Sequence, residues 1–134
     1  MAVTRTRRPH RAGGLIAALT ADAPARVEEA ITVGASDPAE ARAYFCDWGA
    51  RLDPFAPGVD VTSASHTGDT ARATHSGTST ASPRAAGAAA PYLAGRPAAA
   101  PAEVGRALAD RAASGALSDV RPGSPGTLLQ VANP

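Results

Sequence analysis

Cysteine, lysine and aromatic residues are scarce or absent in this chain of 134 residues. Its one cysteine excludes a disulfide within the chain, and a lone thiol cannot hold a metal ion without other ligands. All 13 basic charges are arginines, and the net charge is only +1. One Trp, two Tyr and two Phe offer few platforms on which bases could stack. We therefore expect no nucleic-acid partner, and we interpret Cys46 as a small residue that fills the core.

The chain also lacks a hydrophobic run long enough to cross a membrane. Residues 12–19 are apolar, but a transmembrane helix needs about 20 such residues. A basic cluster at residues 5–11 precedes this run and Ala21-Asp22-Ala23 follows it, an order similar to that of a secretion signal peptide. The alternative is a leader without fixed structure. We assign residues 1–23 to a basic leader or disordered segment and expect no membrane span.

From Pro24 onward the apolar pattern predicts strands and helices within one domain. Residues 27–33 indicate a buried strand that ends at Gly34. The Ala-rich segment 81–93 predicts a buried helix, in which Pro91 is costly unless the helix kinks. Residues 102–114 predict a second, amphipathic helix. The expected fold class is α/β.

A hairpin is expected between these elements. Residues 61–64 alternate as a strand does, and Gly68-Asp69 is a turn signal. His66 and His75 lie in the same part of the chain, and either could act as a base for a nearby serine. We interpret both as solvated or structural residues.

The stretch from His75 to Gly87 joins this hairpin to a glycine turn and the start of a helix. Gly77 can adopt backbone angles closed to other residues, and Ser79 falls at or near the helix N-terminus. Unpaired N–H groups gather there and favour negative charge, which suits acyl transfer by a serine. Gly77-Thr78-Ser79 is also typical of an ordinary helix N-cap.

Residues 77–87 resemble the G-T-S-M-A-S-P-H-V-A-G signature of the subtilisin-like serine peptidases at eight of eleven positions. The departures are Thr80, Arg84 and Ala85. Four further blocks are similar to the proteinase K-like branch: residues 30–35 (A-x-T-V-G-A), 43–49 (S-F-S-N-x-G), 52–58 (L-D-x-F-A-P-G) and the closing strand at 128–131. The resemblance covers about Pro24 to Val131.

This resemblance implies a partial subtilisin-like fold, a parallel sheet with helices whose N-terminal strands are missing. Residues 24–134 would be the C-terminal part of the peptidase domain, with Ser79 as nucleophile and Gly77 and Thr78 in the oxyanion turn. It also implies polypeptide substrates and an extracellular location.

The resemblance implies that activity requires no cofactor. It also implies a site for a structural calcium ion. Asp53 matches a calcium-binding aspartate of the proteinase K-like branch, with backbone carbonyls at the positions of Glu28 and Ala30. Carboxylate and carbonyl oxygens are the ligands that calcium prefers. A solvated turn aspartate is the alternative interpretation.

The family's Asp in D-x-G, His in H-G-T and oxyanion Asn precede the part that is matched here, and the sequence before Pro24 contains neither motif. A serine hydroxyl needs a positioned base to become nucleophilic. We therefore expect serine endopeptidase activity of the family but a truncated, inactive fragment for the chain alone. Two alternatives stay open: a non-catalytic interaction module that complements a separate N-terminal peptidase segment, and a vestigial small secreted protein.

Overall fold

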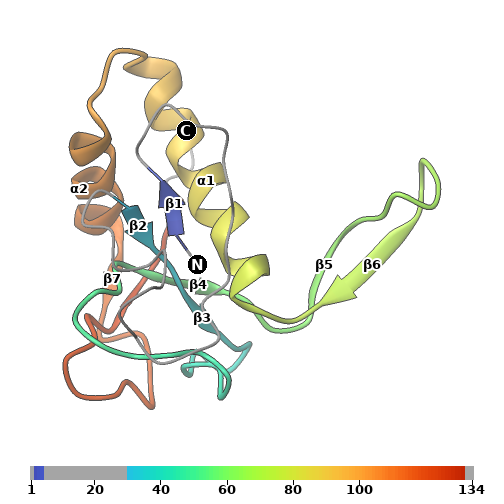
Figure 1. Cartoon of the computed structure of the whole chain (residues 1–134), viewed down its shortest axis with the longest axis horizontal. Coiled ribbons are helices and arrows are strands. Elements are labelled where there is room, and N and C mark those ends of the chain that lie inside the picture. Colours follow the sequence, from blue (N-terminus) through green and yellow to red (C-terminus); the bar gives the residue numbers. More distant parts are fainter. Residues whose placement is uncertain (1, 5–29, 132–134) are drawn as a thin grey trace.

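The computed structural model of the chain describes residues 2–4 and 30–131. The elements in chain order are β1 Ala2–Thr4, β2 Ala30–Thr32, β3 Gly34–Ser36, β4 Phe55–Pro57, β5 Val61–Ala64, β6 Arg72–His75, α1 Thr78–Gly95, α2 Pro101–Arg111, β7 Ala113–Ser114 and β8 Thr127–Leu128. Figure 1 shows α1 and α2 together at one end of the molecule, with the β5–β6 hairpin projecting away from the body.

The central sheet has the order β3-β4-β8-β7. The first three of these strands are parallel, with Gly34 opposite Phe55 and Phe55 opposite Leu128, whereas β7 runs antiparallel to β8. A separate antiparallel pair joins β1 to β2. The predicted α/β class is confirmed, and the sheet is mixed rather than wholly parallel.

One face of α1 packs against β3 and β4 and forms the core with them. Val33 and Phe55 are fully buried, and the helix contributes Ala81, Ala85 and Ala88. Small helix residues permit this close approach. At Gly34 a Cβ would lie 2.5 Å from Phe55 Cδ1, so glycine is required beside the ring.

The prediction that residues 81–93 form a buried helix is correct for the helix and wrong for the burial. α1 extends over Thr78–Gly95, but its buried residues lie on one side and Ala86, Gly87 and Ala90 are exposed, because the sheet covers only that side. The helix continues through Pro91, whose absent N–H would have bonded to the carbonyl of Gly87.

Three predicted boundaries are also wrong. The strand expected to end at Gly34 is followed at once by β3, which begins there, and residues 27–29 lie outside the described part. The second helix ends at Arg111 rather than at residue 114, because Ala112 leaves the helical region at φ −69° and ψ 138° and the chain continues into β7. The closing strand is Thr127–Leu128 rather than 128–131.

The predicted hairpin is confirmed, with Val61 opposite His75 and Ala64 opposite Arg72 in β5 and β6. Of the proposed leader, only residues 2–4 are described, and they form β1. The basic cluster and the apolar run of that leader lie outside the described residues.

Candidate functional site

The turn before α1 has the backbone that the sequence suggested. Gly77 adopts φ 157° and ψ 162°, a conformation open almost only to glycine. The nearest atom to a Cβ at Gly77 would be Ser79 N at 3.7 Å, so the backbone angles rather than lack of space require glycine. Helix α1 begins at Thr78, and Ser79 is its second residue, with an exposed side chain. A nucleophile in this position is accessible and lies among the free N–H groups of the helix start.

Gly58, which follows β4, anchors this turn. Its carbonyl accepts hydrogen bonds from Gly77 N at 2.7 Å and from Thr80 Oγ1 at 3.0 Å. A Cβ at Gly58 would lie 2.6 Å from Ala35 Cβ and 2.9 Å from Gly77 O. The close approach of the two segments therefore depends on glycine at this position.

A second contact joins the two ends of the hairpin beside the turn. Asp60 N donates to Ser76 Oγ at 2.9 Å, and Ser76 Oγ donates to Asp60 Oδ1 at 3.3 Å. Asp60 adopts a left-handed backbone, with φ 53°. Sequence reasoning did not identify Gly58, Asp60, Ser76 or Thr80, since partners this far apart in the chain leave no local pattern.

A hollow of about 380 Å³ lies between β5 and the first turns of α1. Ser79, Thr80 and Arg84 line it from the helix, and residues 61–63 line it from the strand. Arg84 is exposed, so its charge lies in solvent on the side of the hollow that belongs to α1. Ser79 thus lines a space that a ligand could enter.

Neither histidine is bonded to the serine. His75 is an exposed residue of β6, and His66 lies in the exposed turn of the hairpin. Within residues 2–4 and 30–131, no hydrogen bond joins Ser79 to either histidine.

Asp53 is engaged with the backbone of β2. Its Oδ2 accepts a hydrogen bond from Thr32 N at 2.7 Å, and its own N donates to Thr32 O at 2.8 Å. Ala30 is buried in β2, and Glu28 lies outside the described residues. In the described part of the chain, no group of three or more His, Cys, Asp or Glu side chains could hold a metal ion. The donor atoms available for calcium there are one carboxylate and backbone carbonyls, so the fit is partial.

A buried polar cluster, also missed from the sequence, lies at the opposite edge of β3. The Arg42 guanidinium donates to Ala43 O at 3.1 Å and to Cys46 O, and it lies 3.5 Å from Asp119 Oδ2. Cys46 Sγ accepts a hydrogen bond from Ala35 N at 3.1 Å. These contacts close the strand edge that β4 does not cover.

Burial raises the pKa of the Cys46 thiol, against a smaller opposing effect of the hydrogen bond from Ala35. Burial likewise raises the pKa of the neighbouring Asp47 carboxyl. The interpretation of Cys46 as a small core residue is thereby extended, since its sulfur also serves as a hydrogen-bond acceptor.

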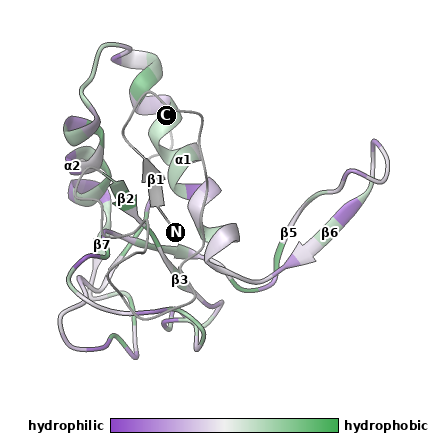
Figure 2. Ribbon diagram, in the orientation of Figure 1, coloured by the Kyte–Doolittle hydropathy of each residue, from purple (hydrophilic) through white to green (hydrophobic). Residues whose placement is uncertain are grey.

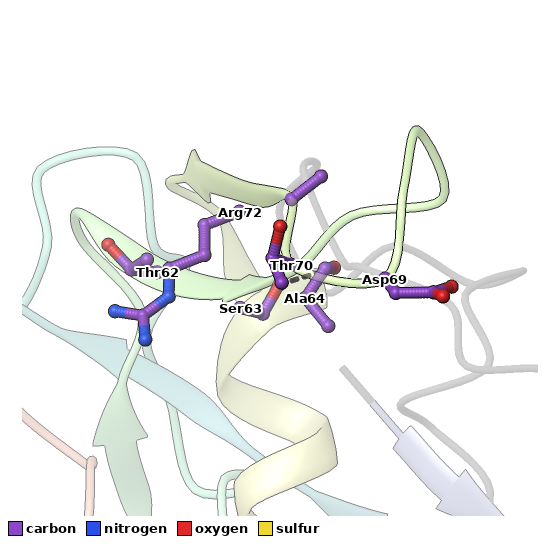
Figure 3. A pocket seen from close by; sticks show the side chains of 7 residues that line it. Thr62, Ser63, Ala64, Asp69, Thr70 and Arg72 are labelled. Atoms are coloured by element: carbon purple, nitrogen blue, oxygen red, sulfur yellow. Dashed lines mark hydrogen bonds between the residues drawn. The ribbon is translucent and has the colours of Figure 1, made fainter.

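The hairpin has its own hollow, of about 570 Å³. Figure 3 shows Arg72 extending beside Thr62, whereas Asp69 points away at the far side near the turn. The two charges are therefore not brought together, and the rest of the lining consists of small residues, three of them with hydroxyls and two of them alanines.

Among the described residues, neither helix is both long and apolar enough to span a membrane.

Comparison with known proteins identifies the wider group. The model of the subtilase family matches residues 12–127. The extracellular serine proteinase of Thermus sp. (strain Rt41A) is 47% identical over 106 residues, which are 79% of this chain and 26% of that protein. The alkaline serine exoprotease A of Vibrio alginolyticus is 42% identical over 106 residues, covering 79% of this chain and 19% of that protein.

A crystal structure of a cold adapted subtilisin-like serine proteinase superposes with a TM-score of 0.76 at 38% identity. The match covers 83% of this chain and 40% of that one, which confirms the partial subtilisin-like fold. The chain spans about a quarter or less of the length of these two curated relatives. From the matched family model, the relatives and the shared fold, the chain belongs to the subtilase family.

Proposed function

We propose that this chain supplies the nucleophile of a subtilisin-like serine endopeptidase, with Ser79 as that nucleophile. The observation that carries the proposal is the exposed position of Ser79, directly after the Gly77 turn and at the start of an 18-residue helix. In this reaction the Ser79 hydroxyl loses its proton to a base while its oxygen attacks the carbonyl carbon of a peptide bond. Gly77 and Thr78 shape the turn, and the N–H groups at the helix start stabilise the oxyanion.

The base must come from elsewhere, and the chain alone is proposed to be inactive. No histidine of the described part is bonded to Ser79. Losing the triad members costs about a millionfold in turnover, a magnitude measured for subtilisin itself. A separate or preceding polypeptide segment that carries the Asp and His would complete the site and would form the rest of the surface that binds a polypeptide substrate.

A fluorophosphonate probe tests the nucleophile, because it labels only an activated serine. We expect no labelling of the chain alone, and labelling after addition of a polypeptide that corresponds to the Asp- and His-bearing part of the Thermus relative. Ser79→Ala must abolish that labelling. If a verified assembly is not labelled, the assignment of Ser79 as nucleophile is contradicted. If the isolated chain is labelled at Ser79, the proposal that the chain alone is inactive is contradicted, and His75 is the first residue to mutate.

A non-catalytic interaction module is the second candidate, and exposed apolar side chains favour it. Tyr44 is 91% exposed and Trp48 is 52% exposed, and Ala86, Gly87 and Ala90 are exposed on α1, much of which has apolar colouring in Figure 2. Such surfaces are typical of sites that another polypeptide covers. If the assembly forms but Ser79→Ala changes neither labelling nor peptide cleavage, this candidate accounts for the chain better than catalysis does. If the chain is instead a vestigial protein with neither role, it should not assemble with the added polypeptide at all.

Two properties of the family extend the proposal. The name of the Thermus relative describes an extracellular enzyme, and we propose the same location for this chain.

We also propose that Asp53 binds calcium together with the carbonyls of residues 28 and 30, where an ion would stabilise the fold. Millimolar calcium should then raise the melting temperature, because a ligand bound only by the folded state stabilises it. Asp53→Asn should remove that increase, and an equal increase in both proteins contradicts the site.

A further inference from the structure

Ser79 is bracketed by two contacts to one carbonyl oxygen. Gly77, two residues before it, donates its N–H to Gly58 O at 2.7 Å, and Thr80, one residue after it, reaches the same oxygen through Oγ1 at 3.0 Å. The backbone of Ser79 is therefore held from both sides against a single point of the segment that follows β4.

Gly58 is itself held by the central sheet. Its N donates to Ser36 O of β3 at 2.9 Å, and it lies so close to Ala35 that a Cβ would approach the Ala35 Cβ to 2.6 Å. The buried strand β3 thus holds Gly58 in place, and Gly58 in turn holds the serine turn. The exposed hairpin, which lies between Gly58 and Gly77 in the sequence, is not needed for this path.

The Thr80 hydroxyl has a specific share in this arrangement. It lies 2.7 Å from Gly77 O as well as 3.0 Å from Gly58 O, and its single proton is shared between the two carbonyls. Thr80 N also donates to Gly77 O at 3.0 Å. Thr80 is one of the positions at which the chain departs from the family signature, where methionine offers no donor. The contact is therefore a property of this chain.

We propose that Thr80 is a positioning residue for Ser79, acting through its hydroxyl. By tying the first turn of α1 to Gly58, it fixes the direction of the free N–H groups at the helix start relative to the Ser79 side chain. Those groups favour negative charge on an atom near them. The inference rests on the proposed role of Ser79, and it concerns local electrostatics that exist with or without a base.

The test replaces the serine oxygen by a group whose charge can be titrated. In Ser79→Cys, the rate of alkylation by iodoacetamide is measured against pH, and the buried Cys46 of the unmodified chain provides the background rate. A thiol at a helix N-terminus titrates below its ordinary pKa of about 8.5. Adding Thr80→Val should move the midpoint upward by about half a pH unit, whereas adding Thr80→Ser should leave it in place.

Thr74→Val is the matched control, because it removes a hydroxyl hydrogen-bonded at 2.8 Å to Thr62 on the hairpin. It should not move the midpoint. An unchanged midpoint in Thr80→Val overturns the inference even if the chain loses stability, since stability alone would reflect a merely structural role. A midpoint that moves equally in Thr80→Ser also overturns it, because the hydroxyl would not be the responsible group.

If Thr80→Val does not fold, the unmodified chain decides. A Thr80 hydroxyl proton that is observed by NMR and exchanges slowly with water supports the contact to Gly58 O. Exchange as fast as that of the exposed Ser63 hydroxyl overturns it. None of these measurements requires peptidase activity, so they can fail while Ser79 remains the nucleophile, and the labelling experiment can fail while they succeed.

Discussion

The body of the molecule and its hairpin are neighbours in the chain but depend on different interactions. In the body, β3 and most of β4 are buried and α1 covers one side of them. In β5 and β6, most residues are exposed, and a pair of threonine hydroxyls links the two strands. Figure 2 shows the polar colouring of β6 against the apolar colouring of much of α1. An isolated two-stranded hairpin is marginally stable in water, so we expect the body alone to carry the free energy of folding.

The serine turn belongs to the body by this criterion. It follows β6 in the sequence, yet its hydrogen bonds run to Gly58 and so to β3. Opening of the hairpin should therefore leave Ser79 in position. The difference between the two regions separates residues that hold the candidate site from residues that only surround it.

Phe55→Ala should have the largest effect and tests whether the body carries the stability. Phe55 is fully buried, and its ring occupies the space beside Gly34 where a Cβ would otherwise lie. Removal of the ring therefore leaves a cavity between the sheet and α1. Such substitutions cost about 3–5 kcal/mol, a large share of the roughly 5–15 kcal/mol that stabilises a typical domain. The free energy of unfolding is measured in urea. Val61→Ala in β5 is the control, and an equal loss there would remove the distinction between the regions.

Arg42→Met should have the second largest effect and tests whether polar contacts also stabilise the body. The Arg42 side chain is 7% exposed, and its guanidinium bonds to two carbonyls and to Asp119, so its loss should cost about 1.5–3 kcal/mol. Arg121→Met is a matched control, because Arg121 approaches the same Asp119 at 3.8 Å but is 53% exposed. There we expect less than about 1 kcal/mol. Equal losses would mean that burial of Arg42 contributes nothing.

The local patterns of the sequence predicted the elements that short-range physics determines. Gly77 predicted the turn, and the Ala-rich run predicted α1. The strand-like alternation of residues 61–64 predicted the hairpin. Boundaries failed at Gly34 and at Ala112, where pairing with a distant strand decides which residues are extended. The prediction that α1 is buried failed for a similar reason, because composition does not reveal how many sides of a helix a sheet will cover.

Of the candidate site, the sequence could reveal only what lies in one stretch. Ser79 and Gly77 were found because a turn, a helix start and a signature coincide there. Gly58 and Asp60 were not, since their partners Thr80 and Ser76 are 22 and 16 residues away. The Arg42 cluster was also missed, because nothing in an isolated arginine indicates that it will be buried.

The Cys46 thiol gives a smaller, pH-dependent effect that again belongs to the body. Burial raises its pKa in the folded state above the unfolded value of about 8.5. The folded state therefore favours the neutral thiol, and this contribution is fully present below pH about 8.5 and is lost as the pH rises through the folded-state pKa. The urea midpoint of the unmodified chain should fall more between pH 8 and 10 than that of Cys46→Ser, whose hydroxyl does not titrate there. Parallel pH profiles would contradict the burial of the thiol.

Thr74→Val should have the smallest effect, and it compares one substitution in the two regions. The Thr74 hydroxyl is exposed, so after loss of the Thr62 contact its partner bonds to water and no buried polar atom is left unpaired. Valine is as suitable for a strand as threonine. The free energy of unfolding should change by less than about 0.5 kcal/mol, whereas Thr80→Val should cost about 1–2 kcal/mol because the lost hydrogen bond to Gly58 O is partly buried. A loss above about 1 kcal/mol for Thr74→Val would show that the hairpin is part of the cooperative unit, and that the serine turn depends on both regions.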